Sequence, residues 1–171
     1  NDYVLKTSNG GQSWQSQDLS ALPFILFPRA IHFFDAQHGM ILGNNVTGLE
    51  LSFTTNDGGQ NWHEAIVTGP GIVRMVDVQM VSPSEAFAIG WQGAVFKTSD
   101  GGQSWSPVIV PGAMEGWSDL DFSDPLHGKL LSEDHSLYTT ADGGSTWQAQ
   151  NTPAQSDYLR MQFFDANNGY L

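Results

Sequence analysis

The chain contains no cysteine, and only six of its 171 residues are lysine or arginine. The lack of cysteine excludes disulfide bonds and thiolate-ligated metal centres. The few basic residues stand against eighteen acidic ones, and the net charge of −12 predicts that nucleic acid is not a partner. No apolar run approaches the roughly 20 residues that a membrane-spanning helix needs, so we expect no direct membrane insertion.

Helical periodicity is also missing, whereas turn-forming residues are abundant. Nineteen glycines and eight prolines are spread along the chain between short runs rich in β-branched and aromatic residues. One octet recurs four times, with its tryptophans 42 to 48 residues apart; the copies are TSNGGQSW at 7–14, TNDGGQNW at 55–62, TSDGGQSW at 98–105 and TADGGSTW at 140–147. A fixed period of this size indicates a repeat architecture.

Each repeat offers four short strands, and four-stranded modules of this period are typical of β-propeller blades. We therefore predict an all-β fold with whole blades over residues 29–67, 74–110 and 117–151, each with strands A to D from the centre outward. Residues 1–19 would supply only strands C and D, and residues 159–171 only strands A and B, which makes one split or composite blade. Because the first residue is not Met and both ends lie in strand-like stretches, we expect a processed or truncated piece of a larger ring, with a four-blade ring as the alternative.

The octet occupies the turn between strands C and D. Its Asp or Asn can accept hydrogen bonds from turn amides, its glycines allow positive φ, and its Trp can fold back into the blade. Since one residue set recurs in every blade, packing explains it better than a carbohydrate or calcium site does. The predicted structural residues are Asn9, Trp14, Asp57, Trp62, Asp100, Trp105, Asp142 and Trp147. We predict no metal, no cofactor and no catalytic residue.

The octet resembles the Asp-box, or BNR, repeat of sialidases, sortilin-like receptors and some glycoside hydrolases. The fuller module, with an F-x-D-x-x-H-G turn before the octet, is most similar to the photosystem II stability/assembly factor family. This resemblance covers essentially the whole chain. It implies a propeller, usually of seven blades, that is not an enzyme and that carries an arginine-rich patch implicated in partner binding.

An antiparallel meander places the A–B turns and the octets at one face of the ring, which we call the octet face. The B–C turns and the D–A crossings share the other, the crossover face. Irregular loops more often bind partners than repeated ones do, so we look for a site on the crossover face. All three arginines fall there, as do two tryptophans outside the octets; the predicted partner-binding set is Arg29, Arg74, Arg160, Trp91 and Trp117. The alternative for the tryptophans is core packing.

A polar position in strand A of each module is expected to line the central channel, occupied by His32, Asp77, Asp121 and Gln162. Asp119 and Asp121 would lie about 6–7 Å apart on one strand face, a spacing that also suits a glycosidase carboxylate pair. A sialidase would need a Tyr/Glu pair near the arginines, but no Glu accompanies Tyr158, and Tyr138 lies in strand C.

These observations predict a non-catalytic scaffold that binds a protein or peptide with an acidic group, such as a subunit of a membrane complex, through the crossover face. The expected location is extracytoplasmic: periplasm, thylakoid lumen or secreted. A sialidase-like or other glycan-directed glycosidase or lectin is the alternative.

Overall fold

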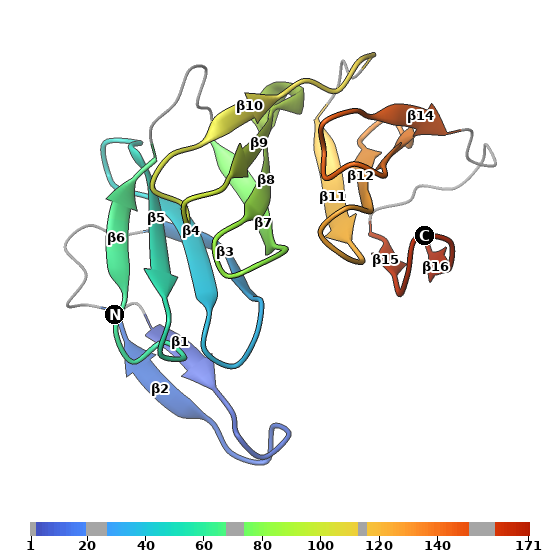
Figure 1. The fold of residues 1–171 in the computed structure, drawn as a ribbon. Helices are drawn as coiled ribbons and strands as arrows, with labels where there is room; N and C mark the ends of the chain where they lie inside the picture. The colour runs from blue at the N-terminus through green and yellow to red at the C-terminus, as the bar shows by residue number, and fades with distance from the viewer. Residues whose placement is uncertain (1–2, 20–26, 68–73, 113–115, 151–159) are drawn as a thin grey trace.

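The computed structural model describes residues 3–19, 27–67, 74–112, 116–150 and 160–171, and these form antiparallel β-sheets (Figure 1). Three sheets have four strands each, and in each sheet the spatial order follows the chain order. The first blade contains β3 (Phe27–Phe33), β4 (Gly39–Asn44), β5 (Glu50–Thr55) and β6 (His63–Ile66). The second contains β7 (Met75–Met80), β8 (Ala86–Gly90), β9 (Val95–Thr98) and β10 (Ser106–Val108). The third contains β11 (Trp117–Phe122), β12 (Gly128–Ser132), β13 (Leu137–Thr140) and β14 (Gln148–Gln150).

Two further strand pairs lie at the chain ends. The hairpin of β1 (Tyr3–Lys6) and β2 (Gln15–Asp18) forms one two-stranded sheet, and β15 (Gln162–Phe163) with β16 (Gly169–Tyr170) forms another. In the described part of the chain these pairs do not join each other (Figure 1). The one helical element within the same ranges is a short 3-10 turn, η1 (Trp91–Gly93).

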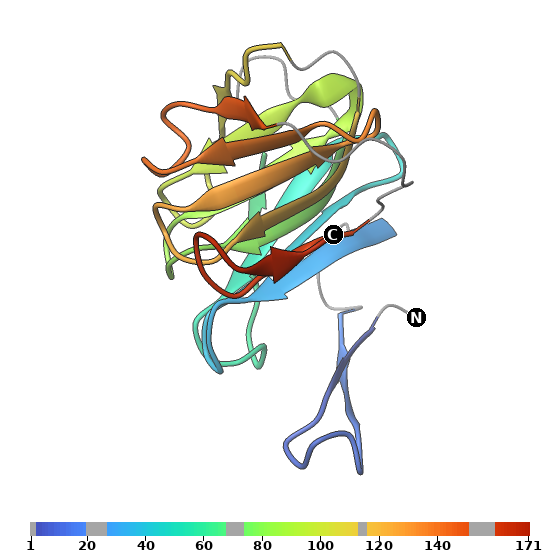
Figure 2. The same ribbon diagram turned by 90° about the vertical axis from the view of Figure 1, so that its right-hand side faces the viewer.

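The second strand of each blade is almost wholly buried. Every residue of β8 and β12 is buried, as are the first five of β4, whereas all three residues of the outermost strand β14 are exposed. Buried strands of this kind are covered on both faces. Figure 2 shows the sheets stacked one behind another, and the first strands β3, β7, β11 and β15 are successive neighbours. This is the packing of propeller blades around their innermost strands, so the predicted fold class is confirmed.

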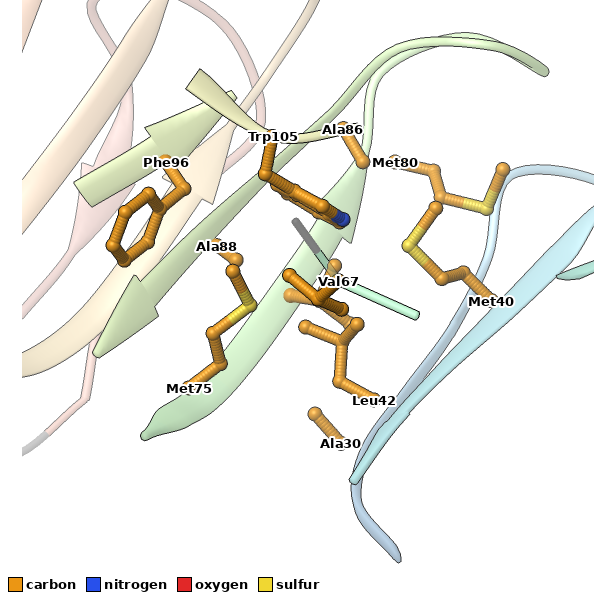
Figure 3. Close-up of a cluster of buried hydrophobic side chains, with 11 residues drawn as sticks. Ala30, Met40, Leu42, Val67, Met75, Met80, Ala86, Ala88, Phe96 and Trp105 are labelled. Atoms are coloured by element: carbon orange, nitrogen blue, oxygen red, sulfur yellow. The ribbon is translucent and has the colours of Figure 1, made fainter. Parts of the chain in front are cut away.

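The apolar core is divided among the junctions between blades. Between the first and second blades, Trp105 lies with Met40, Leu42, Val67 and Met75 (Figure 3). A second cluster fills the junction between the second and third blades, where the Phe87 and Phe122 rings stack with centroids 4.2 Å apart. Because each core joins two consecutive sheets, a blade depends on its neighbour for burial.

The strand register corrects one alignment made from the sequence. His32 pairs with Met40 and Asp121 with Lys129, and the corresponding position of the second blade holds Gln79, which pairs with Phe87. Asp77 lies two residues earlier and is equivalent to Asp119. The sequence could not distinguish the two registers, because residues two apart on a strand share a face and both are polar here.

Candidate functional site

The octet turns have the hydrogen bonding that the sequence predicted. In the second copy, the Thr55 hydroxyl donates to Asp57 (2.7 Å) and accepts from the Gly59 N–H (2.9 Å), while Asp57 accepts from the Asn61 N–H (2.9 Å). The third and fourth copies repeat this pattern around Asp100 and Asp142, and Asn9 accepts the same turn amide in the first copy. The side-chain oxygens of the octets therefore form their hydrogen bonds within their own turn, and their role is structural.

The octet tryptophans fill the junctions between blades rather than their own blade alone. Trp105 is 2% exposed against residues of the preceding blade, and Trp147 is buried in the next junction. Trp62 packs against the cluster that includes Leu19. Trp14 is 57% exposed, and no described sheet precedes its hairpin. The exposure of Trp14 therefore accords with the absence of a preceding sheet among the described residues.

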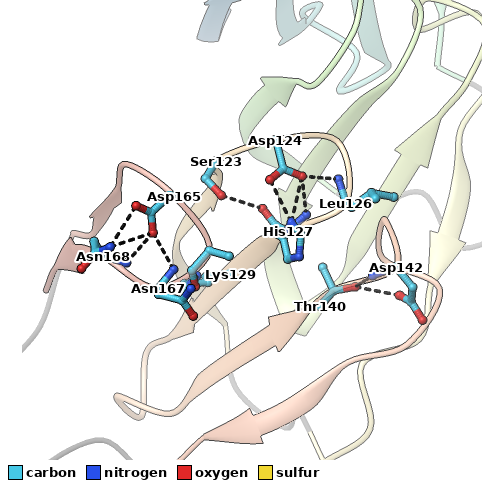
Figure 4. A network of polar contacts seen from close by, with 11 residues as sticks. Ser123, Asp124, Leu126, His127, Lys129, Thr140, Asp142, Asp165, Asn167 and Asn168 are labelled. Carbon is cyan, nitrogen blue, oxygen red and sulfur yellow. Dashed lines mark hydrogen bonds and ion pairs between the residues drawn. The ribbon is translucent and has the colours of Figure 1, made fainter.

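The A–B turns join the octets at the octet face. The Gly58, Gly101 and Gly143 amides each donate to a carbonyl of the A–B turn in their own blade, at 2.8 to 3.0 Å. The A–B turns are themselves closed by an aspartate; Asp124 accepts from the amides of Leu126 and His127 and contacts the His127 ring at 2.8 Å (Figure 4). The predicted grouping of the turns is therefore correct.

Arg29, at the crossover face, is committed to internal partners. Its guanidinium pairs with Glu50 at 3.1 Å, donates to the Met75 carbonyl at 2.7 Å and also donates to the Asn44 side chain. The Arg29 and Glu50 side chains are only 12% and 8% exposed. Burial raises the pKa of Glu50, and the Arg29 charge partly offsets that rise. Arg29 therefore ties the first blade to the start of β7 instead of standing free on the surface.

Arg74 is an exposed arginine next to the contacts of Arg29 with the start of β7. Its guanidinium carbon lies 4.7 Å from the centroid of the Trp91 ring, and its carbonyl accepts the Trp91 amide at 3.0 Å. The Trp91 side chain is itself 54% exposed, so the pair forms a stacked cationic and aromatic surface. Arg74 also lines a hollow of about 440 Å³ that Arg29, Asn44, Leu49 and Glu50 complete.

Arg160 is separated from the other two arginines by its partners. It contacts Asp119 at 3.1 Å and Asp77 at 3.9 Å, yet its side chain remains 75% exposed. Burial raises the pKa of Asp77, and the nearby negative charge of Asp119 adds to this effect. Arg29 lies in β3, whereas Arg74 and Arg160 precede β7 and β15. The structure brings Arg29 and Arg74 together at one hollow, while Arg160 belongs to a carboxylate cluster between the second and third blades.

The polar side chains of the innermost strands bind the backbone of the next blade. The His32 ring accepts the Met80 amide at 3.2 Å, the Gln79 side chain accepts the Phe122 amide at 2.6 Å, and Asp121 accepts the Phe163 amide. Gln162 is exposed on β15. Glu50 and Asp119 act in a similar way, because they accept the amides of Met75 and Met161. The sequence analysis did not predict these roles or that of Gln79, because no local pattern marks a side chain that bonds to the next repeat.

Of the remaining residues singled out in the sequence, Trp117 is part of the core. Trp117 is 4% exposed and meets the Tyr138 ring edge-on, with centroids 5.4 Å apart, so core packing is the correct alternative for it. Tyr158 lies outside the described residues. Within the described ranges, no group of three or more side chains could hold a metal ion, and no helix is long and apolar enough to cross a membrane.

Solved structures with a similar architecture include YCF48 proteins and a glycoside hydrolase. A YCF48 bound to a D1 peptide matches with a TM-score of 0.67 at 23% identity, over 95% of this chain and 51% of that one. YCF48 from Cyanidioschyzon merolae matches with a TM-score of 0.60 at 25% identity, over 75% and 41%. A GH74 xyloglucanase from Xanthomonas campestris matches with a TM-score of 0.58 at 18% identity, over 79% and 20%. The chain thus spans about half the length of the YCF48 structure that it matches.

No curated protein sequence matches the chain. The family model described as photosynthesis system II assembly factor YCF48 matches residues 7–116, which include three of the four octets and the Arg29, Arg74 and Trp91 region. Since this match covers more than half of the chain, and the fold agrees with it, the protein belongs to the YCF48 family of photosystem II assembly factors.

Proposed function

We propose that this protein is a non-catalytic β-propeller that binds a protein or peptide through its crossover face. The observation that carries the proposal is the exposed Arg74 guanidinium, stacked on the exposed Trp91 ring beside a hollow of about 440 Å³. Arginine on an aromatic ring keeps its hydrogen-bond donors in a fixed plane, which suits a carboxylate ligand. The proposed ligand is therefore an acidic side chain or a terminal carboxylate of the partner.

The three arginines have different roles in this proposal. Arg74 contacts the acidic group, and Trp91 supplies apolar contact area. Arg29 acts as a positioning residue, because its bond to the Met75 carbonyl holds the residue that follows Arg74. Arg160 is a second contact for the partner, although Asp119 and Asp77 neutralise much of its charge. The YCF48 structure with a bound D1 peptide supports a peptide as the class of partner.

We also propose that the protein has no glycosidase activity and acts outside the cytoplasm. The carboxylate pair that suggested a glycosidase is occupied by structural partners. One oxygen of Asp119 meets Arg160 and the other accepts the Met161 amide at 2.6 Å, while Asp121 accepts the Phe163 amide. A general acid or nucleophile must reach its substrate, and these bonds oppose that. The extracytoplasmic location rests on family membership, and the targeting of a full-length fusion protein would test it.

The binding proposal is tested with a fluorescently labelled D1 peptide and fluorescence anisotropy. We expect Arg74→Ala to weaken binding about tenfold, the effect of losing one charge-assisted hydrogen bond. Lys97→Gln is the control, because it removes the same charge from a lysine that bonds to Gly143 of an octet. A wild-type protein that does not bind the peptide, or equal effects of the two substitutions, would contradict the proposal. Turnover of fluorogenic glycosides that is lost in Asp121→Asn would contradict the non-enzyme part.

A further inference from the structure

A second hollow is lined by Trp91 of the Arg74–Trp91 pair, and its charge is opposite to that of the first hollow. It measures about 300 Å³ and is lined by Val76, Gly90, Trp91, Gln92, Gly116, Trp117 and Glu133. The first hollow contains two arginines and one glutamate, whereas the second contains one glutamate and no basic residue. Trp91 lines the second hollow and Arg74 lines the first, so the stacked pair contributes one side chain to each hollow.

Glu133 is available to a ligand. It is exposed, and it forms no ion pair or side-chain hydrogen bond in the described part of the chain. Its carboxylate lies against Gly116, where an added Cβ would be 2.7 Å from an oxygen of Glu133. The Glu133 amide donates to the Gly116 carbonyl at 2.9 Å, which fixes the backbone at the rim of the hollow.

The other side chains of this hollow also favour a cation. An indole ring attracts a positive charge over its face, and Trp91 offers an exposed ring. Gln92, at the exposed tip of η1, adds an amide carbonyl as a neutral acceptor. A carboxylate, an aromatic face and an amide together match the guanidinium of arginine or the ammonium of lysine.

We propose that this second hollow binds a basic side chain of the same extended peptide whose acidic group meets Arg74. This inference rests on the proposed function. The partner segment would then carry an acidic and a basic residue on either side of the Arg74–Trp91 pair. Such a site selects for the order of charges along the peptide, because the reversed order places like charges together in both hollows.

The first test uses N-acetylarginine amide as a probe and follows the indole N–H signals of the protein by NMR, with the Trp91 signal assigned from Trp91→Phe. We expect the probe to shift the Trp91 signal in a saturable way, and N-acetylglutamine amide to shift it much less. Glu133→Gln should abolish the difference. Glu64→Gln is the matched control, because it removes one negative charge from the outer strand β6. An unshifted Trp91 signal, or an equal response in Glu133→Gln, would overturn the proposal.

The second test measures whether the protein binds the acidic and the basic residue of one peptide at the same time. The probes are labelled peptides in which Asp and Lys are separated by one, two or three glycines, compared with the same peptides containing Gln in place of Lys. At one spacing we expect the Asp/Lys peptide to bind about two- to fivefold more tightly, the effect of one exposed ion pair, and Glu133→Gln to remove this advantage. No advantage at any spacing would overturn the inference. Failure of the acidic peptide to respond to Arg74→Ala, with the arginine probe still shifting Trp91, would contradict only the proposed function.

Discussion

The two faces of the propeller use similar residues in different ways. At the octet face, aspartates and hydroxyls bond to their own turns, and the copies around Asp57, Asp100 and Asp142 are almost identical in geometry. At the crossover face, the described B–C turns differ from blade to blade, and Arg74 and Trp91 expose charge and aromatic surface that no turn requires. The repeated polar residues therefore stabilise the fold, and the unrepeated exposed ones are those that the proposed function assigns to the partner.

Exposure, rather than residue type, separates the two roles. Arg29 lies at the crossover face, but its side chain is only 12% exposed, since its guanidinium is shared among Glu50, Asn44 and Met75. Trp91 and Trp117 show the same contrast, with 54% and 4% exposure. Position on a face therefore does not suffice to assign a binding role.

The largest expected effect comes from breaking a blade junction at an octet. Trp105→Ala removes a side chain that is 2% exposed between two blades, and we expect a loss of about 3–5 kcal/mol in the free energy of unfolding. Trp14→Ala changes the same octet position where the ring is 57% exposed, and we expect about 0.5 kcal/mol or less. Denaturant unfolding measures both variants. Similar losses would show that the tryptophan acts within its own turn.

The second prediction separates two arginines of one face. Arg29→Ala leaves the Glu50 carboxylate buried without its cation, and we expect a loss of about 3 kcal/mol or more in the free energy of unfolding. Arg74→Ala should change that quantity by less than about 0.5 kcal/mol, because the side chain is exposed. If urea unfolding shows equal losses, the distinction between a positioning and a contacting arginine is wrong.

The third prediction concerns acid unfolding of the octet face. The Thr146 hydroxyl and amide bonds lower the pKa of Asp142 to about 2, and the amides of His38 and Gln37 lower the pKa of Asp35 to about 2. An unfolded Asp titrates near pH ~3.9. The stabilisation is therefore complete above about pH 4 and is lost as the pH falls toward 2. We expect Asp142→Asn, which copies the native Asn9, to flatten the fall of the melting temperature over this range; an unchanged slope would contradict the turn bonding.

The fourth prediction concerns the junction between the first two blades. Burial lowers the pKa of His32, whose ring accepts the Met80 amide in its neutral form. An unfolded His titrates near pH ~6.5, so this stabilisation is present above that pH and is lost as the pH falls below it. His32→Gln introduces the group that the second blade uses at the same position, Gln79, and its bond does not titrate.

We expect His32→Gln to reduce the fall in melting temperature between pH 7 and pH 5 while leaving the value at pH 7 nearly unchanged. Scanning calorimetry across this range measures the effect. The double variant His32→Gln/Asp142→Asn provides the control. Asp142→Asn acts below about pH 4, so it should not alter the effect of His32→Gln between pH 7 and pH 5. An identical pH profile in wild type and His32→Gln would show that the Met80 amide bond is not coupled to protonation.

The sequence predicted the regular parts of the molecule well. The octets predicted the strand order, because Gly-rich turns and a Trp recur at a period typical of four-stranded blades, between short runs that lack helical periodicity. The sequence did not predict the register around Asp77 and Gln79, since alternation has a period of two and cannot distinguish positions two apart. It also could not predict that Arg29 pairs with internal partners or that Trp117 is core, because both depend on contacts with other strands or blades.

The central claim is that the partner binds at the crossover face and the octets serve the fold. Hydrogen exchange with and without the bound D1 peptide tests this claim most directly, with mass spectrometry to locate the protected segments. We expect peptide binding to slow exchange in residues 44–49 and 90–94, and to leave the octets at 55–62 and 98–105 unchanged. Slowed exchange concentrated in the octets, with no change in the crossover loops, would contradict the account.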